Sequence, residues 1–313
     1  MSGFDVLVLG DANPDLVMSG ETVVPAFGQA ERLVDEARLV IGGSGAIFAF
    51  GADKLGLRVA FAGVVGDDVF GRYMCEQLQA RGVDTSAVAV LPERATGVTV
   101  VLSGREDRAM LTFAGTTGDL RRAVIDADLL SRTRHIHVSS YFLQRALVPE
   151  LPELFLEART GEATTSLDPT WDPSGSWDSG LMALIPEIDV FLPNEVEALS
   201  MARISTVDGA IARLRSSGAG TVVVKTAGQG SVGAQASDLI AVPALPTQVV
   251  DSTGAGDSFD AGFLAGLLGG EPLRRCLEIG YACGALSTRG IGGTSTQPTM
   301  VEALEAIERG SVP

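Results

Sequence analysis

Residues 249–263 read VVDSTGAGDSFDAGF, and this stretch decides the fold. A strand ends near Asp251, a glycine-rich turn follows, and a helix begins at about Gly256. Glycines let successive backbone N–H groups point at one spot, and the helix N-terminus adds its partial positive charge there. The sequence therefore predicts an anion site built from backbone amides, without any side-chain cation.

Asp257 lies at the same helix terminus, and its carboxylate has two interpretations. A lone carboxylate at that position is often an N-cap. A carboxylate beside an anion site also suits phosphoryl transfer, which needs donors around the phosphate and a base beside the attacking hydroxyl. The chain has no GxxxxGK[ST] loop, and GDANPD at 10–15 lacks the later glycines of GxGxxG. Neither a Walker A loop nor a Rossmann dinucleotide site is therefore expected.

The composition limits the partners. The 313 residues carry a net charge of −16 and are 46% hydrophobic, enough for a large buried core. An acidic surface repels phosphodiester backbones and anionic lipid, so we expect no nucleic acid and no membrane partner. Cys75, Cys276 and Cys283 lack ligand or CxxC spacing and are interpreted as reduced thiols. With no signal-peptide pattern and no long apolar run, the sequence predicts a cytoplasmic protein.

Short β-branched runs alternate with helical patterns along most of the chain, which indicates βαβ units around a parallel sheet. We expect strands at 5–10, 59–66, 135–140, 189–193 and 221–225, and helices at 46–55, 70–81 and 258–268. The fold class is therefore predicted to be α/β.

Two segments, 16–40 and 95–117, instead alternate apolar and polar residues. This period predicts half-exposed antiparallel strands inserted into the α/β body. We expect a small β-lid, with the body made of residues 1–15, 41–94 and 118–313. An edge extension of the main sheet would give the same periodicity, so both arrangements remain open. The exposed face of such a lid also makes a homodimer through the lid a hypothesis.

The chain resembles the ribokinase family, the PfkB-type carbohydrate kinases, in several motifs that keep the family order. DSTGAGD at 251–257 is similar to the family's C-terminal signature. The others are GGSGAIFAFGADKLGLRVAFAGVVGDDVFGRYMCEQLQARGVD at 42–84, LPNEVEA at 192–198 and VVVKTAGQGSVG at 222–233. The resemblance covers nearly the whole chain. It implies a ribokinase-like three-layer sandwich with a mainly parallel central sheet, and an enzyme that uses ATP and Mg²⁺ to phosphorylate a hydroxyl of a small sugar-like molecule.

The resemblance also implies roles on the phosphate side. Asp257 would be the catalytic base, and the anion hole would consist of the amides of Gly254, Ala255, Gly256 and Asp257. The implied nucleotide contacts are Asn194, Lys225, Thr226, Gly228 and Gly230. Glu197 would organise Mg²⁺ through water, and the implied site for a monovalent cation, K⁺, is Asp251, Thr253, Arg289, Gly292 and Ser295. The NxxE pattern is also that of an N-cap Asn with a helical Glu, and Lys225 also fits a solvated residue at a strand end.

On the acceptor side, Asn13 and Asp15 match the family's sugar-hydroxyl contacts, and Gly42 and Gly43 its diglycine. A carboxylate that accepts two hydroxyl protons can grip a polyol, although NPD is also an Asx-Pro turn. The family usually has Asn where this chain has Ile47. LDPTWDP at 167–173 likewise resembles its DxNxR segment without the Asn or the Arg. These departures put ribose itself in doubt.

Three functions therefore remain open: a sugar kinase, a nucleoside kinase of the same superfamily, and a catalytically silent nucleotide-binding regulator. The apolar Ile47, Phe48 and Phe50 would suit a nucleoside base, or belong to the core. A phosphosugar acceptor is disfavoured, because no cluster of Lys or Arg lies near the acceptor motifs, and the candidates for such a contact are Arg105 and Arg108 in the lid.

His135 and His137 alternate on a strand without a nearby acidic ligand pattern. They are predicted to be structural, and no metal is assigned to them.

Overall fold

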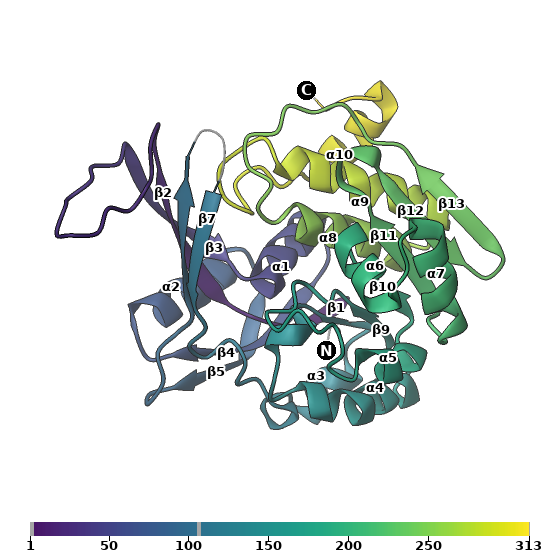
Figure 1. The fold of residues 1–313 in the computed structure, drawn as a ribbon. Helices are drawn as coiled ribbons and strands as arrows, with labels where there is room; N and C mark the ends of the chain where they lie inside the picture. The colour runs from purple at the N-terminus through teal and green to yellow at the C-terminus, as the bar shows by residue number, and fades with distance from the viewer. Residues whose placement is uncertain (1–2, 105–107, 313) are drawn as a thin grey trace.

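The computed structural model describes residues 3–104 and 108–312, which form two β-sheets and the helices around them (Figure 1). The strands are β1 (Val6–Leu9), β2 (Asn13–Ser19), β3 (Glu36–Gly42), β4 (Val59–Gly66), β5 (Asp84–Leu91), β6 (Val98–Ser103), β7 (Arg108–Phe113), β8 (His135–Val138), β9 (Thr164–Leu167), β10 (Val190–Phe191), β11 (Thr221–Lys225), β12 (Ser231–Gln235) and β13 (Asp238–Val242). The α-helices are α1 (Ser44–Lys54), α2 (Val69–Ala80), α3 (Ala127–Ser131), α4 (Leu151–Thr160), α5 (Leu181–Leu184), α6 (Glu195–Ala202), α7 (Val207–Ser216), α8 (Ala255–Leu268), α9 (Leu273–Ser287) and α10 (Met300–Arg309).

The larger sheet has nine strands in the order β13-β12-β11-β10-β9-β8-β1-β4-β5. All neighbours pair in parallel except β11–β12 and β12–β13 at one edge. The mainly parallel α/β class expected from the sequence is thus confirmed. Parallel strands bring their carboxyl ends to one edge of a sheet, where ligands of open α/β folds bind.

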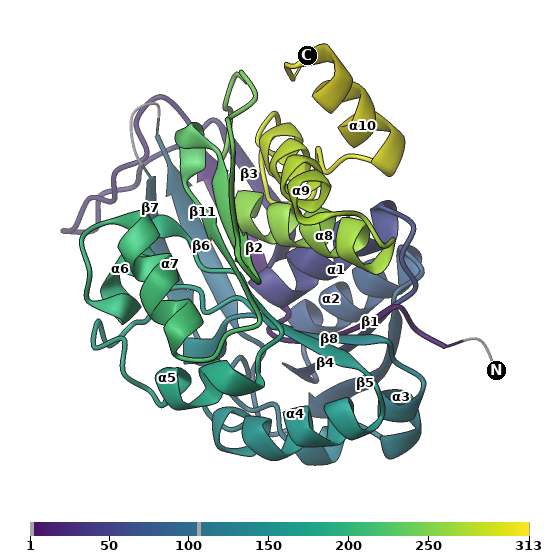
Figure 2. The ribbon, with the colours of Figure 1, turned by 90° about the vertical axis from the view of Figure 1, so that its right-hand side faces the viewer.

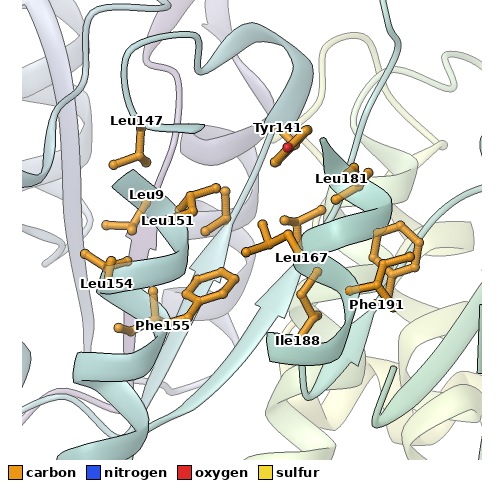
Figure 3. Close-up of a cluster of buried hydrophobic side chains, with 14 of the residues drawn as sticks. Leu9, Tyr141, Leu147, Leu151, Leu154, Phe155, Leu167, Leu181, Ile188 and Phe191 are labelled. Atoms are coloured by element: carbon orange, nitrogen blue, oxygen red, sulfur yellow. The ribbon is translucent and has the colours of Figure 1, made fainter. Parts of the chain in front are cut away.

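Helices cover both faces of this sheet, as the two views show (Figures 1 and 2). The side chains of β1 are all buried, and successive side chains point to opposite faces of the sheet. Both faces must therefore be covered. Val6 and Val8 pack with α1, α2, α8, α9 and α10, whereas Leu7 and Leu9 pack with α3 to α7. Figure 3 shows part of the second core, to which β1 contributes Leu9 and α4 contributes Leu151, Leu154 and Phe155. The predicted three-layer sandwich is therefore confirmed.

The smaller sheet has the order β3-β2-β6-β7 and is separate from the larger one. β2–β3 and β6–β7 are antiparallel, but β2–β6 is parallel, so the expectation of wholly antiparallel strands was wrong for that pair. Residues 20–35 contain no strand and project from the body (Figure 1). Because β2 begins at Asn13 and β3 ends at Gly42, acceptor residues assigned to the body lie on this second sheet. Its movement as a lid stays a prediction.

One edge of the second sheet is open to solvent. Every residue of β7 is exposed, including Met110, Leu111 and Phe113. A homodimer through this sheet remains a prediction. None of the helices in the described part of the chain has the length and apolarity needed to span a bilayer.

Candidate active site

The N-terminus of α8 has the geometry of an anion site. α8 begins at Ala255, one residue earlier than expected, and its N-cap is Gly254 with φ +71°. A Cβ on Gly254 would lie 2.8 Å from both Gly293 Cα and Ile47 Cγ2, so only glycine fits there. Within residues 3–104 and 108–312, the N–H groups of Gly256 and Asp257 have no hydrogen-bond partner. These first-turn donors are therefore available to an anion.

Asp257 lies in the first turn of α8 and is not its N-cap. It is half-buried, and burial together with the charge of Asp168 raises its pKa well above the ordinary value. The nearby Lys225 charge and a hydrogen bond from Ser44 act in the opposite direction. A carboxylate with a raised pKa accepts a proton more readily than an ordinary aspartate.

The side chain of Lys225 is largely covered and lies close to this helix terminus. Its Nζ lies 2.9 Å from Asp168 Oδ2 and 3.0 Å from Asp260 Oδ2, and the three side chains are 10%, 7% and 0% exposed. A Cβ on Gly256 would lie 3.6 Å from the same Nζ. Burial raises the pKa of Asp260 well above its usual value, whereas the Lys225 charge helps to hold the pKa of Asp168 low. Lys225 is thus no solvated strand-end residue, and its contact with nucleotide stays a prediction.

Asn194 and Glu197 form a capping box at the start of α6. Asn194 Oδ1 accepts from Glu197 N at 3.0 Å, and Glu197 Oε2 accepts from Asn194 N at 2.8 Å. Burial and the charge of Asp168 raise the pKa of Glu197 to about 7. The N-cap interpretation of NxxE is confirmed. The contacts of Asn194 with nucleotide and of Glu197 with Mg²⁺ stay predictions.

The turn after β11 carries the other predicted nucleotide residues. Thr226 is buried, and Gly230 has φ +111° with its Cβ position 2.0 Å from Val242 O, so the fold itself requires this glycine. A Cβ on Gly228 would meet nothing within 4 Å. Gly228 therefore leaves open space beside the turn.

The four predicted acceptor residues come together. Asn13 and Gly42 are paired across β2 and β3. A Cβ on Gly42 would lie 2.2 Å from Asp15 Oδ1, and one on Gly43 would lie 3.0 Å from Asn13 Oδ1. Burial, followed by the charges of Asp11 and Asp251, raises the pKa of Asp15 to about 7. The diglycine thus leaves room for the polar groups of Asn13 and Asp15.

Asp11 lies among the candidate site residues, although the sequence analysis did not assign it. Its Oδ1 accepts from Gly45 N at 3.2 Å and from Ser140 Oγ at 3.0 Å. It thereby ties the end of β1 to the start of α1 and to the end of β8. Asp11 acts electrostatically on both Asp15 and Asp257, so these three carboxylates share one region. The available signal was an aspartate directly after the first strand, in GDANPD.

Ile47 packs on the phosphate-side turn. It is 3% exposed, and Cβ atoms built on Gly254 and Gly293 would lie 2.8 Å and 2.6 Å from its side chain. Phe48 stacks on His137 with ring centroids 4.0 Å apart, and Phe50 is also buried. His135 and His137 bond to Ser166 on the neighbouring strand. These residues are therefore core residues, as expected for the histidines.

Most of the predicted cation-site residues lie around Asp251. Asp251 Oδ2 accepts from Gly292 N at 2.9 Å, and Thr253 N donates to Asp251 Oδ1 at 2.9 Å. Ser295 Oγ lies 3.4 Å from Gly292 O. The guanidinium of Arg289 instead donates to Leu286 O. Potassium itself stays a prediction at this point.

Arg108 of β7 also reaches Asp251 and was not assigned to this group. Arg105 lies outside the described residues.

A surface hollow of about 910 Å³ lies at the opposite edge of the large sheet. Its lining includes Arg134, Thr164, Val190 and Thr221, which stand at the amino ends of β8 to β11. It contains none of the residues above. The polar and glycine residues predicted from the sequence instead gather at the carboxyl edge, where α/β folds bind ligands.

Comparison with known proteins agrees with this arrangement. The family model "pfkB family carbohydrate kinase" matches residues 4–300. A fructokinase from Klebsiella pneumoniae is 30% identical over 94% of this chain and 96% of its own length. A nucleoside kinase from Methanothermobacter thermautotrophicus is 28% identical over 88% and 86%. The crystal structure of a putative ribokinase II from E. coli in complex with ATP and Mg²⁺ has a TM-score of 0.87 and 25% identity over 98% of this chain and 99% of that one. The chain therefore belongs to the pfkB family of carbohydrate kinases and is an ATP-dependent carbohydrate kinase.

Proposed function

We propose that this kinase transfers the γ-phosphoryl group of ATP to a hydroxyl of a small sugar or sugar-like molecule, with Asp257 as the base. One observation carries the proposal. A carboxylate with a raised pKa stands in the first turn of α8 beside two amides that have no partner among the described residues, and Asp11 links it electrostatically to Asp15. A proton acceptor, an anion site and a polyol-binding pair of side chains therefore occupy one region.

In the proposed reaction, Asp257 takes the proton from the acceptor hydroxyl as that oxygen attacks phosphorus. The amides of Gly256 and Asp257 stabilise the charge on the transferred phosphoryl group. Asn13 and Asp15 hold other hydroxyls of the acceptor, so that the reacting oxygen is kept in position. ATP, when bound, supplies the phosphoryl group, and Mg²⁺ supplies a counter-charge for the phosphates.

The residues present fit a water-mediated Mg²⁺ better than a direct protein cage. The described residues contain no group of three or more His, Cys, Asp or Glu placed to hold a metal ion. Yet Asp168, Glu197 and Asp260 are buried close to Lys225, and burial together with the charge of Asp168 raises the pKa of Glu197 to about 7. The excess negative charge of these carboxylates would favour binding of a divalent cation nearby. Mg²⁺ commonly keeps several of its waters, so it can be held through them and not by direct protein ligands. Glu197 and Asn194 would orient those waters.

The experiment that tests the function is an ADP-release screen of the purified protein against sugars, sugar acids, polyols and nucleosides. We expect acceptor-stimulated turnover with a sugar or sugar-like compound. Turnover with nucleosides alone would favour the nucleoside kinase, which the similarity to a nucleoside kinase supports. Ile47, Phe48 and Phe50 do not favour it, because they are buried in the core and offer no surface to a base. ATP binding without stimulation by any acceptor would favour a silent regulator.

Replacing Asp15 should weaken acceptor binding selectively. Asp15→Ala removes a buried carboxylate from the acceptor residues, and the loss of a hydrogen bond to a charged group predicts an increase in acceptor KM of about 10–100-fold. The dissociation constant for ATP should hardly change. Steady-state kinetics and ATP titration measure the two effects, with Glu36→Ala on the neighbouring β3 as the control. If Asp15→Ala instead abolished ATP binding and left the acceptor KM constant, the acceptor side and the phosphate side of the site would have been assigned the wrong way round.

The second sheet should close over the acceptor. Asn13 and Asp15 lie on β2, so an acceptor bound to them contacts this sheet directly. Closure would exclude water, which otherwise competes with the hydroxyl and causes ATP hydrolysis. We expect hydrogen exchange in residues 16–40 and 95–117 to slow on addition of acceptor, beyond the effect of an ATP analogue alone. Protection confined to the α/β body would contradict the lid and leave the kinase assignment intact.

A further inference from the structure

A closed set of hydrogen bonds surrounds the carboxylate of Asp251. Oδ1 accepts from Thr253 N at 2.9 Å, from Thr253 Oγ1 at 2.7 Å and from Arg108 Nη1 at 3.1 Å. The same Nη1 donates to Thr253 Oγ1 at 2.7 Å, and Oδ2 accepts from Gly292 N. The Asp251 side chain is 18% exposed and that of Arg108 36% exposed. This group joins the second sheet to the segment just before α8.

The location of this group gives it influence over the anion site. Thr253 directly precedes Gly254, the N-cap whose conformation sets the direction of the free amides. The N–H groups of Val250 and Asp251 also donate to Thr288 O at the end of α9. Residues 250–253 are thus held from the body by Thr288 and Gly292, and from the second sheet by Arg108. A displacement of these residues would move the amides that are to hold phosphate.

A free monovalent cation does not fit beside Asp251 while Arg108 is in place. Oδ1 of the carboxylate already accepts three hydrogen bonds, two from Thr253 and one from Arg108, which leaves it no lone pair for a cation. Gly292 N donates to the other carboxylate oxygen, Oδ2, so both oxygens are engaged while Arg108 is in place. Burial raises the pKa of Asp251, but the bonds from Gly292 and Thr253 and the Arg108 charge hold it below its usual value. The carboxylate is therefore an anion that already has a counter-charge.

We propose that Arg108 is a positioning residue that serves Asp251 as a tethered cation, so that the α8 anion site is set by the second sheet and needs no free K⁺. The proposal rests on the proposed kinase function and deepens it. Arg108 begins β7, which pairs with β6, and β6 pairs with β2 at Thr99↔Asp15. Asp15 is also within electrostatic reach of both Arg108 and Asp251. An acceptor bound to Asp15 would therefore stabilise one position of the second sheet. In that position Arg108 contacts Asp251 and fixes the segment that leads into α8.

The test compares wild type, Arg108→Gln and Arg108→Lys in KCl, NaCl and tetramethylammonium chloride at equal ionic strength. Arg38→Gln on β3 is the matched control, because Arg38 pairs locally with Glu36. We expect wild-type kcat to be the same in all three salts. Arg108→Gln should lose about ten- to hundredfold in kcat without K⁺, the usual effect of losing a positioning contact. K⁺ should then restore much of the rate by taking the vacated place, and Arg108→Lys should lose less.

Two further measurements need no acceptor and so separate this proposal from the kinase assignment. The unfolding midpoint of Arg108→Gln should rise specifically in KCl, because an ion that binds only the folded state stabilises it, whereas wild type should not distinguish the salts. Affinity for a non-hydrolysable ATP analogue should follow the same pattern. A wild-type protein stabilised or activated specifically by K⁺ would overturn the proposal, as would an Arg108→Gln protein indistinguishable from Arg38→Gln in every salt.

Discussion

Asp257→Asn is expected to lower kcat by about 10²–10⁴, the usual contribution of a positioned general base, while the affinity for ATP stays close to that of wild type. Asparagine keeps the size of the side chain and leaves the Gly256 and Asp257 amides in place, so the anion site survives without a proton acceptor. The measurement is acceptor-stimulated ADP release together with ATP titration. Asp208→Asn is the matched control, because Asp208 is an exposed carboxylate in the first turn of α7.

The pH dependence gives a second readout of the same residue. The pKa of Asp257 is raised well above its usual value by burial and by Asp168. The base is active only when deprotonated, so wild-type kcat should fall as the pH drops through this raised pKa. The residual activity of Asp257→Asn should lack this acid limb. Near-normal turnover in a correctly folded Asp257→Asn protein would show that the carboxylate is not the base.

Lys225→Met should destabilise the fold by about 3–5 kcal/mol, as expected when one partner of a buried ion pair is removed. Asp168 and Asp260, which are 7% and 0% exposed, would lose their shared cation inside the body. Denaturant unfolding measures the effect. Lys54→Met is the control, since the ammonium of Lys54 bonds to the carbonyl of Gln297 and is less buried.

A double variant tests the cause of that loss. Lys225→Met combined with Asp260→Asn removes a carboxylate together with the cation, so it should recover part of the stability that the single change loses. A Lys225→Met protein as stable as wild type would contradict the role of the buried cluster.

The sequence predicted the candidate site from residues that are consecutive and missed residues that come together only in the fold. Residues 254–257 lie on one turn, so the amide site followed from local geometry alone. Asp168 directly follows β9 in LDPTWDP, and Asp11 follows β1 after Gly10 in GDANPD, so both offered the signal of a carboxylate just after a strand. Asp260 offered none. It lies within a helix of small and apolar residues, and only the packing of α8 against β11 reveals its partner Lys225.

The second sheet shows a different limit. Period-two patterning identified its strands, but it carries no information on partners, so the parallel pairing of β2 with β6 could not be derived. The same patterning was extended through residues 20–35, where Phe27 and Leu33 are 97% and 89% exposed. Hydrophobic residues on the surface look the same in a sequence as buried ones. The sequence analysis considered Arg108 only as a candidate contact for a phosphosugar. It could not pair Arg108 with Asp251, which lies 143 residues later, because their proximity arises only in the fold.

The central place of β1 has a consequence for synthesis of the chain. β1 pairs with β4 on one side and with β8 on the other. β4 ends at Gly66, whereas β8 begins at His135, so the second partner leaves the ribosome roughly 70 residues later. At ~5–20 residues per second this interval is on the order of several seconds. During that time the nascent chain presents a fully apolar strand with one unpaired edge, the kind of surface that chaperones cover and that aggregates when they do not.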